Sequence, residues 1–157
     1  MIKIGSPLPA HEFTILTDEG KTTATSDQLF QGKKVVLFAV PGAFTPTCSN
    51  SHLPGFVGEA DRFKAKGVDA ICCLSVNDAF VMRAWQQDQQ ADAITMLADG
   101  AGTFTRALGL AKDTGEFGGL RAQRFALVAE NGVVTALNVE APGKFEVSSA
   151  ETMLALL

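Results

Sequence analysis

Short apolar runs that end at turn residues are the main feature of the pattern of hydrophobic and polar positions. After Lys34, residues 35–40 are apolar and rich in β-branched side chains, and the run stops at Pro41-Gly42, which predicts a buried central strand over 34–40. The Asn131-Gly132 pair lies between two further apolar runs, and such a turn predicts a β-hairpin. The predicted strands cover residues 34–40, 68–76, 94–98, 125–129 and 133–138.

Apolar positions at helical spacing fill the segments between these strands. The first predicted helix has a kink at Pro54-Gly55 and ends at Gly67, which stands where a glycine commonly follows a helix. Asn77 and Asp78 offer N-caps for the second. The predicted helices cover residues 49–66, about 79–88, 102–108 and, after a capping-box pattern at 148–151, the C-terminal segment.

The order of these elements indicates the fold class. Strands and helices alternate until a final hairpin and helix, which is typical of an α/β domain with a mixed sheet and helices on both faces. The hairpin favours a thioredoxin-like sheet over a purely parallel one. No repeat, low-complexity tract or linker divides the chain, and 157 residues are enough to bury a core, so we expect one domain over residues 1–157.

Charge and composition narrow the classes of partner. The net charge of −4 and the sequence pI near 5.1 indicate no basic surface for nucleic acid. The apolar runs are too short to span a bilayer, and the first residues lack the pattern of a signal or transit peptide, so we expect a cytoplasmic protein that binds neither nucleic acid nor membrane. Three cysteines do not make a secreted disulfide framework and indicate a reducing compartment.

Cys48 is the residue with the clearest chemistry. It lies after the first central strand and near the start of the next predicted helix, where backbone N–H groups and the helix dipole favour a thiolate. Such surroundings lower a cysteine pKa from about 8.5 toward neutrality and make the sulfur a nucleophile. Thr45 is close enough to hydrogen-bond the sulfur or a bound peroxide, and Pro41 and Phe44 are placed to shield it from water. The alternative from these features alone is an inert, buried cysteine.

A longer pattern surrounds this cysteine. Pro41-X-X-X-Thr45-X-X-Cys48 matches the active-site pattern of peroxiredoxins, and the segments PGAFTPTCSNSHLPGF, CLSVNDAFVMRAW, MLADG and GVVTALNVE resemble the peroxiredoxin-5 (type II) subfamily. The resemblance extends over nearly the whole chain. It implies a thioredoxin-fold peroxidase that reduces hydrogen peroxide and alkyl hydroperoxides and needs no metal or organic cofactor.

The resemblance also implies roles for single residues. Cys48 corresponds to the peroxidatic cysteine, Thr45 to the threonine that orients the peroxide, and Pro41 to the proline that shields the pocket. The implied step is attack of the Cys48 thiolate on one peroxide oxygen, which releases water or an alcohol and leaves a sulfenic acid. We expect the backbone N–H of Thr47 to stabilise the developing charge, and Phe44 to contact the substrate.

An arginine completes the expected site. The arginine of the family comes directly before an aromatic residue that begins a late strand, so Arg124, followed by Phe125, is the first candidate and Arg121 the second. A fixed cation beside the sulfur favours the thiolate and holds peroxide oxygens by charge-assisted hydrogen bonds. Without the resemblance, an arginine at the start of a strand is more simply a surface residue in an ion pair.

Three further residues bear on the chemistry. His52 lies four residues after Cys48, and because the chain has two histidines and no CxxC motif, we interpret it as a residue that adjusts hydrogen bonds beside the active-site loop and not as a zinc ligand. Cys72 and Cys73 fall in one predicted strand, so their side chains point to opposite faces and are poorly placed to bridge each other. A role for either in resolving oxidised Cys48 stays open.

The chain departs from one branch of the family near its C-terminus. Members that resolve internally carry a cysteine where this chain has Val147-Ser148-Ser149. We therefore expect a one-cysteine mechanism, in which glutathione with glutaredoxin, or thioredoxin, reduces the sulfenic acid of Cys48.

The family also implies a homodimer joined through the loops around the active site. Phe44 and Val81-Met82-Arg83 are the expected contributors. Three other aromatic residues belong either to this partner surface or to the core, namely Phe80, Trp85 and Phe117.

Two other functions are compatible with a reactive Cys48. The first is a thiol redox sensor or thioredoxin-like binding domain that is oxidised but does not turn over. The second is a cysteine hydrolase or acyl transferase in which His52 acts as the base, although the sequence offers no clear third residue to orient that histidine.

Overall fold

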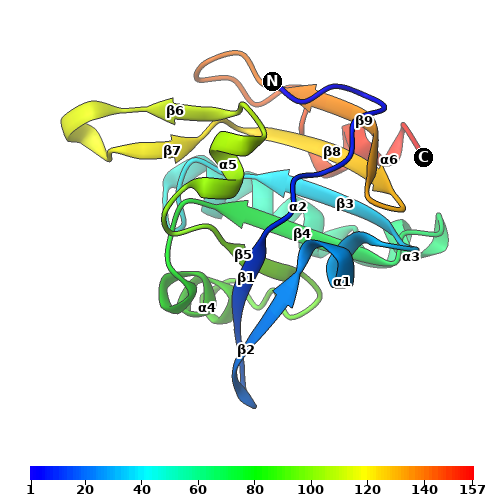
Figure 1. The fold of residues 1–157 in the computed structure, drawn as a ribbon, viewed down its shortest axis with the longest axis horizontal. Helices are drawn as coiled ribbons and strands as arrows, with labels where there is room; N and C mark the ends of the chain where they lie inside the picture. The colour runs from blue at the N-terminus through cyan, green and yellow to red at the C-terminus, as the bar shows by residue number, and fades with distance from the viewer.

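A computed structural model describes residues 1–157, and a seven-stranded mixed sheet forms its centre (Figure 1). The strand order is β2-β1-β5-β4-β3-β8-β9, with β3, β4 and β5 parallel and the other neighbours antiparallel. The strands of this sheet are β1 (Glu12–Thr17), β2 (Gly20–Thr25), β3 (Lys34–Ala39), β4 (Ala70–Ser75), β5 (Thr95–Ala98), β8 (Phe125–Glu130) and β9 (Val133–Val139). The mixed α/β sheet predicted from the sequence is confirmed.

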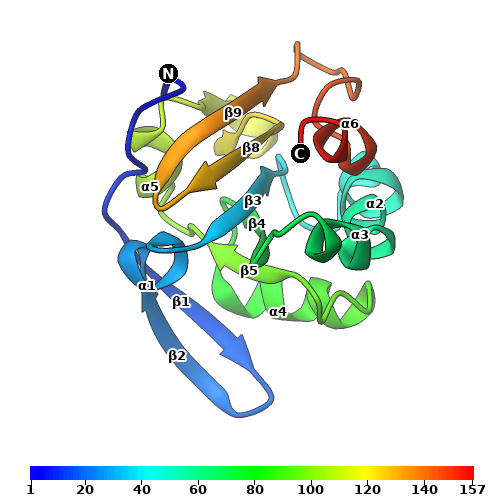
Figure 2. The same cartoon turned by 90° about the vertical axis from the view of Figure 1, so that its right-hand side faces the viewer.

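Helices cover both faces of the sheet, as Figure 2 shows. One face packs against α2, α3, α4 and α6, and the other packs against α1 and α5. Their bounds are α1 (Ser26–Phe30), α2 (Leu53–Gly58), α3 (Ala60–Ala65), α4 (Ala79–Asp88), α5 (Thr103–Ala107) and α6 (Ala150–Leu154). None of these helices combines the length and apolar character that crossing a bilayer requires.

Alternation along the central strands divides the core into two clusters. Phe38 of β3 packs with one cluster and Leu37 with the other, because neighbouring side chains of a strand point to opposite faces. The same rule separates Cys73 from Cys72 in β4. Both are buried free thiols, so the prediction that these adjacent cysteines point to opposite faces is confirmed.

The capping residues predicted from the sequence lie at or within one residue of the observed helix ends. Asp78 caps α4 by accepting a hydrogen bond from the N–H of Val81 at 2.8 Å. The predicted capping box at 148–151 is wrong by one residue, because Ser149 is the N-cap of α6 and accepts from the N–H of Thr152 at 3.2 Å. The hydroxyl of Ser148 is unavailable as a cap, since it donates to Glu140 at 2.7 Å.

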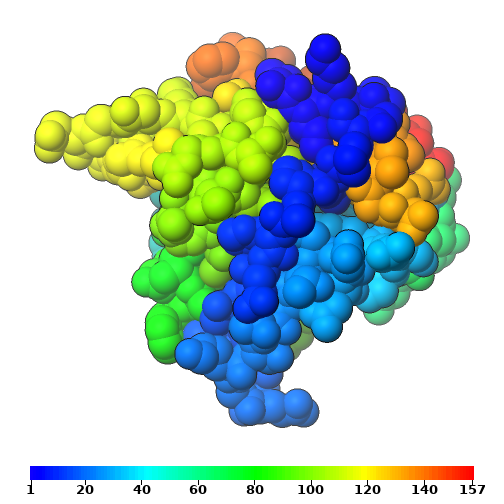
Figure 3. Space-filling view, in the orientation of Figure 1, coloured from blue at the N-terminus to red at the C-terminus, as the bar shows by residue number.

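Two hairpins and one short helix have no counterpart among the predicted elements. The β1–β2 hairpin and α1 are rich in threonine and polar residues, and β2 has no buried residue, so no apolar period marks them. The second hairpin pairs β6 (Ala111–Asp113) with β7 (Leu120–Ala122) around a 3-10 turn, η2 (Gly115–Phe117). Its strands are too short for a pattern, and it projects from the body of the protein (Figure 3).

The helix that follows Cys48 consists of three segments. It begins with a π-helical turn, η1 (Cys48–His52), in which the N–H of Leu53 bonds to the carbonyl of Cys48. Pro54 then lies in the first turn of α2, where its missing N–H removes a helical bond, and Glu59 separates α2 from α3. The predicted interruption near Pro54 is therefore a widened turn that contains Cys48, a feature common at functional sites.

Candidate active site

Strand pairing brings Cys48 and Arg124 together. Ala39 at the end of β3 pairs with Phe125 at the start of β8, so the loop after β3 and the residue before β8 meet at one edge of the sheet. Arg124 Nη2 donates a hydrogen bond to Cys48 Sγ at 3.1 Å. The thiol itself is fully buried, and the guanidinium is partly exposed.

His52 holds the other end of the guanidinium. Arg124 Nη1 donates to His52 Nδ1 at 2.8 Å, and His52 Nε2 donates to the carbonyl of Ser148 at 2.9 Å, which assigns the ring proton to Nε2. Burial, together with the charge of Arg124, lowers the pKa of His52 to about 3. Both ring nitrogens are therefore occupied and neither contacts the sulfur, which removes the geometry that a Cys48–His52 hydrolase needs.

Glu140 anchors the segment that supplies this carbonyl, residues 141–148, called here the strap. Its carboxylate accepts hydrogen bonds from the N–H groups of Glu146 and Val147, both at 2.9 Å, and from the N–H and hydroxyl of Ser148. Burial acts to raise the pKa of Glu140, but these hydrogen bonds outweigh it and hold the pKa below its ordinary value. The N–H of Glu140 bonds to the carbonyl of Arg124 at 3.0 Å, which ties the anchor to the arginine.

The strap contacts Arg124 a second time through Phe145. The guanidinium carbon of Arg124 lies 5.7 Å from the centre of the Phe145 ring, within the range of a cation–π contact. The same ring lies 4.9 Å from the centre of the His52 imidazole. Glu140 thus acts on Cys48 indirectly, by ordering the strap that orients His52 and Arg124.

Hydrogen bonds from the end of β4 and the turn after it hold the loop from Pro41 to Thr47 in place. Asn77 Oδ1 accepts from the N–H of Ala43 at 3.0 Å and from the Ser75 hydroxyl at 2.6 Å, and the Thr45 hydroxyl donates to the carbonyl of Gly42 at 2.7 Å. Phe44 has a φ of 65°, a conformation that costs free energy for a bulky residue and occurs preferentially at functional sites.

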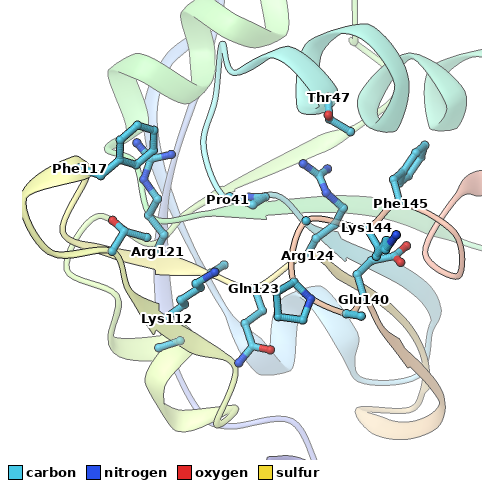
Figure 4. A pocket seen from close by; sticks show the side chains of 16 residues that line it. Pro41, Thr47, Lys112, Phe117, Arg121, Gln123, Arg124, Glu140, Lys144 and Phe145 are labelled. Carbon is cyan, nitrogen blue, oxygen red and sulfur yellow. The ribbon is translucent and has the colours of Figure 1, made fainter.

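A cavity of about 560 Å³ opens beside this arrangement (Figure 4). Of the candidate site residues, Pro41, Thr47, Arg121 and Arg124 line it. Cys48, Thr45 and Phe44 do not: Cys48 is fully buried behind Arg124, and Phe44 is 52% exposed. The other polar and aromatic lining residues are Lys112, Thr114, Phe117, Gln123, Glu140, Lys144 and Phe145.

Several of the residues around the site have no recognisable pattern in the sequence. Glu140 directly follows a strand, which marks the right edge of a sheet, but its partners lie in a strap without secondary structure. For Ser148 the sequence indicates only a capping box and a segment without a resolving cysteine, and neither predicts its hydrogen bonds to Glu140 and His52. Lys112 and Phe145 lie in segments without a regular pattern, and only the folded chain brings them to the cavity.

The two other cysteines differ from Cys48 in their surroundings. Burial raises the pKa of Cys72 to about 12, a change that the charge of Lys33 only partly offsets. Burial, with smaller effects from Cys48 and Cys72, also raises the pKa of Cys73 well above its ordinary value. Neither therefore carries appreciable thiolate near neutral pH, and Cys48 is the one cysteine with a cationic hydrogen-bond donor.

The buried His52 predicts that acid destabilises the fold. The unfolded chain binds a proton at this residue near pH 6.5 and the folded protein only near pH 3, so stability is complete above about pH 6.5 and is lost as pH falls. The free energy of unfolding should decrease by up to about 1.4 kcal/mol per pH unit from this group. Glu140, with its lowered pKa, adds a loss in the same direction below pH 4.5.

Urea unfolding at pH 7.0, 6.0 and 5.0 measures this dependence. We expect the His52→Gln variant to be less stable at pH 7 but to lose less stability between pH 6 and 5 than the parent. Equal losses in the two proteins would show that His52 does not carry the effect. The His11→Gln variant is the control, because His11 is partly exposed.

Comparison with known proteins agrees with this geometry. The family model described as Redoxin matches residues 3–154. The chain is 50% identical to peroxiredoxin-2C of Oryza sativa subsp. japonica, over 99% of this chain and 98% of the relative. Among solved structures, reduced Prx3 of Vibrio vulnificus in complex with H2O2 is 61% identical with a TM-score of 0.97, over 99% of each chain. Peroxiredoxin 5 of Alvinella pompejana is 32% identical with a TM-score of 0.87, over 99% of this chain and 97% of that one.

These similarities extend over the full length of the chain and include the helix-covered sheet, so they confirm the thioredoxin-like fold and the resemblance stated from the sequence. Peroxiredoxins are thiol-dependent peroxidases, a class of oxidoreductase. The chain belongs to the redoxin family and, within it, to the type II peroxiredoxins.

Proposed function

We propose that Cys48 is the peroxidatic residue and that it reduces hydrogen peroxide and alkyl hydroperoxides. The observation that carries the proposal is the 3.1 Å hydrogen bond from Arg124 Nη2 to Cys48 Sγ, since a guanidinium donor stabilises a thiolate more than a thiol. The Cys48 thiolate attacks the hydrogen-bearing peroxide oxygen, an S–O bond forms and the O–O bond breaks. The second oxygen leaves as hydroxide or alkoxide and takes a proton from solvent to become water or an alcohol. Cys48 becomes a sulfenic acid.

The neighbouring residues have distinct parts in this step. Arg124 stabilises the charge that passes from sulfur to the leaving oxygen. Thr45 orients the peroxide, because its hydroxyl donates to Gly42 and keeps acceptor lone pairs for a peroxide O–H. Pro41 and Thr47 line the approach to the sulfur, the latter with a backbone N–H for the developing charge. Phe44 is an expected substrate contact that lies exposed outside the cavity.

Regeneration is proposed to use a thiol from another molecule. The segment Val147-Ser148-Ser149, in which internally resolving relatives carry a cysteine, has none, and Cys72 and Cys73 are buried with raised pKa values. A one-cysteine cycle then needs glutathione with glutaredoxin, or thioredoxin, to reduce the sulfenic acid.

The proposed assembly is a cytoplasmic homodimer of single-domain chains. Three exposed aromatic side chains support an interface, with exposed fractions of 52% for Phe44, 72% for Phe80 and 83% for Phe117. One expected contributor is excluded, because Met82 is 1% exposed and belongs to the core. Trp85, for which partner surface and core were both open, is fully buried and also belongs to the core.

Stopped-flow measurement of peroxide reduction tests the proposed function. Trp85, the single tryptophan, donates from Nε1 to the hydroxyl of Ser49, the residue after Cys48, so its fluorescence reports on changes at the sulfur. We expect a fluorescence change with a second-order rate constant at least about a thousandfold above that of free cysteine, followed by catalytic turnover when a thiol is supplied.

The outcomes separate the peroxidase from its alternative. Rapid oxidation without turnover under every thiol would support a redox sensor. Oxidation no faster than that of free cysteine would contradict both. The Cys72→Ser variant is the matched control and should behave as the parent.

A further inference from the structure

Two cations face each other across the β6–β7 hairpin. Lys112 and Arg121 are directly opposite in the register of this antiparallel pair, so their side chains leave the hairpin on the same face. Both line the cavity next to Cys48 (Figure 4). Neither forms an ion pair with an acidic side chain. Like charges in this position destabilise a hairpin, and a bound anion would reverse that effect.

The guanidinium of Arg121 packs at the cavity wall against an aromatic ring and two glycines. It lies over the ring of Phe117, with 5.3 Å between the guanidinium carbon and the ring centre. A Cβ at position 42 would come within 3.0 Å of Arg121 Nη1, and a Cβ at position 118 would collide with the guanidinium. Glycine at both positions therefore makes room for a cation that no acid neutralises.

The charge of the whole cavity is positive. Its lining contains four cations, Lys112, Arg121, Arg124 and Lys144, and one acid, Glu140. The Glu140 carboxylate is already occupied by donors of the strap. Although the chain has a net charge of −4, this cavity attracts anions by its local positive charge.

We propose that this cavity binds the carboxylates of a small acidic thiol, the reductant of Cys48, through Arg121 and Lys112. The inference rests on the proposed one-cysteine cycle. Arg121 and Lys112 are on the hairpin side of the cavity, and Arg124, the donor to the buried Cys48 sulfur, is on the other side. A thiol that spans the cavity therefore places its sulfur beside Arg124, next to the oxidised cysteine. Bidentate pairing of a guanidinium with a carboxylate fixes the orientation.

Reduction of the Cys48 sulfenic acid at this site consumes two thiol molecules. The thiolate of the bound molecule attacks the sulfur of the Cys48 sulfenic acid, an S–S bond forms and the S–O bond breaks. The oxygen leaves as hydroxide and becomes water by taking up the proton that the thiol released on ionisation. A second thiolate attacks the outer sulfur of the mixed disulfide, a disulfide leaves, and Cys48 returns as thiolate. Two thiols are oxidised for each sulfenic acid reduced.

Glutathione and its diethyl ester are the probes, because they share one thiol and differ in their carboxylates. Oxidised Cys48 is prepared with hydrogen peroxide, and the rate constant of its reaction with each thiol is measured by Trp85 fluorescence, with mass spectrometry of the quenched mixed disulfide. We expect Arg121→Ala to lower the ratio of the rate constant with glutathione to the rate constant with the ester about tenfold. Arg121→Lys should lower this ratio less, and Lys112→Ala should lower it about threefold. The control Lys64→Ala changes an exposed lysine and should leave the ratio unaltered.

Each other outcome contradicts the proposal in a distinct way. An unaltered ratio in Arg121→Ala and Lys112→Ala would overturn the carboxylate site. A carboxylate peroxide is the competing ligand: if Arg121→Ala slows oxidation by linoleic acid hydroperoxide relative to its methyl ester, while the thiol ratio stays constant, the cavity serves the oxidant. Failure of the parent protein to form a sulfenic acid in the preparative step would overturn the proposed function and, with it, this inference.

Discussion

Replacement of Cys48 by serine should lower the second-order rate constant for peroxide reduction by at least about a thousandfold. A serine hydroxyl is not ionised near neutral pH, so the variant loses the nucleophile while keeping the small side chain in its buried place. The remaining thiols do not substitute, because burial raises the pKa of Cys72 to about 12 and that of Cys73 well above its ordinary value. Competition against a peroxidase of known rate, with both peroxide types, measures the constant.

The double variant Cys72→Ser/Cys73→Ser is the matched control for that experiment. It removes two of the three thiols and should keep the parent rate within about threefold, provided that thermal unfolding shows a folded protein. Substantial peroxide reduction by Cys48→Ser, or loss of reduction in the double variant, would place the reactive sulfur in β4 and contradict the role of Cys48.

Replacement of Arg124 by alanine has the second-largest expected effect, a loss of about 10²–10³-fold in the same constant. The change removes the donor to Cys48 Sγ and also leaves Nδ1 of the buried His52 without its partner. The loss should be in the oxidation step, since the guanidinium stabilises charge as the O–O bond breaks. Stopped-flow measurement at several peroxide concentrations isolates that step from turnover.

Arg124→Lys separates charge from geometry. An ammonium keeps the cation but cannot reproduce the flat fork that reaches Cys48 and His52 together, so we expect a rate between those of the parent and the alanine variant. Arg121→Ala is a further comparison within the same cavity, and its defect should be mainly in thiol-dependent reduction. A larger oxidation defect in Arg121→Ala than in Arg124→Ala would exchange the roles assigned to the two arginines.

The geometry of the site depends on the strap as well as on the motif around Cys48. Arg124 is oriented by His52 and Phe145, and both depend on residues 141–148, which Glu140 orders through four donors. Substitutions far along the chain from Cys48 can therefore change its reactivity. The same dependence links the reactive form to the pH range in which His52 is neutral and Glu140 is ionised.

The sequence pattern predicts two kinds of element: strands that are buried in the sheet, and turns or caps that depend only on neighbouring residues in the chain. The strands β3, β4, β5 and β8 are apolar because the sheet buries them, and the edge strand β9 follows from the Asn131-Gly132 turn that joins it to β8. That turn and the Asp78 cap need only their own neighbours in sequence. The β1–β2 and β6–β7 hairpins are short or polar, and their stability comes from packing that no window of sequence contains. Pattern therefore missed the hairpin that carries Lys112 and Arg121.

The sequence by itself determined the type II peroxiredoxin family, the mixed sheet and the segment that carries Cys48, because a motif and its periodicity are properties of the linear chain. Only the tertiary structure decided between Arg124 and Arg121 as the donor to the sulfur, since the pairing of Ala39 with Phe125 sets which arginine reaches it. It also decided the cavity charge and the role of Glu140, because hydrogen bonds and Coulomb attraction depend on distances in space, which folding alone establishes.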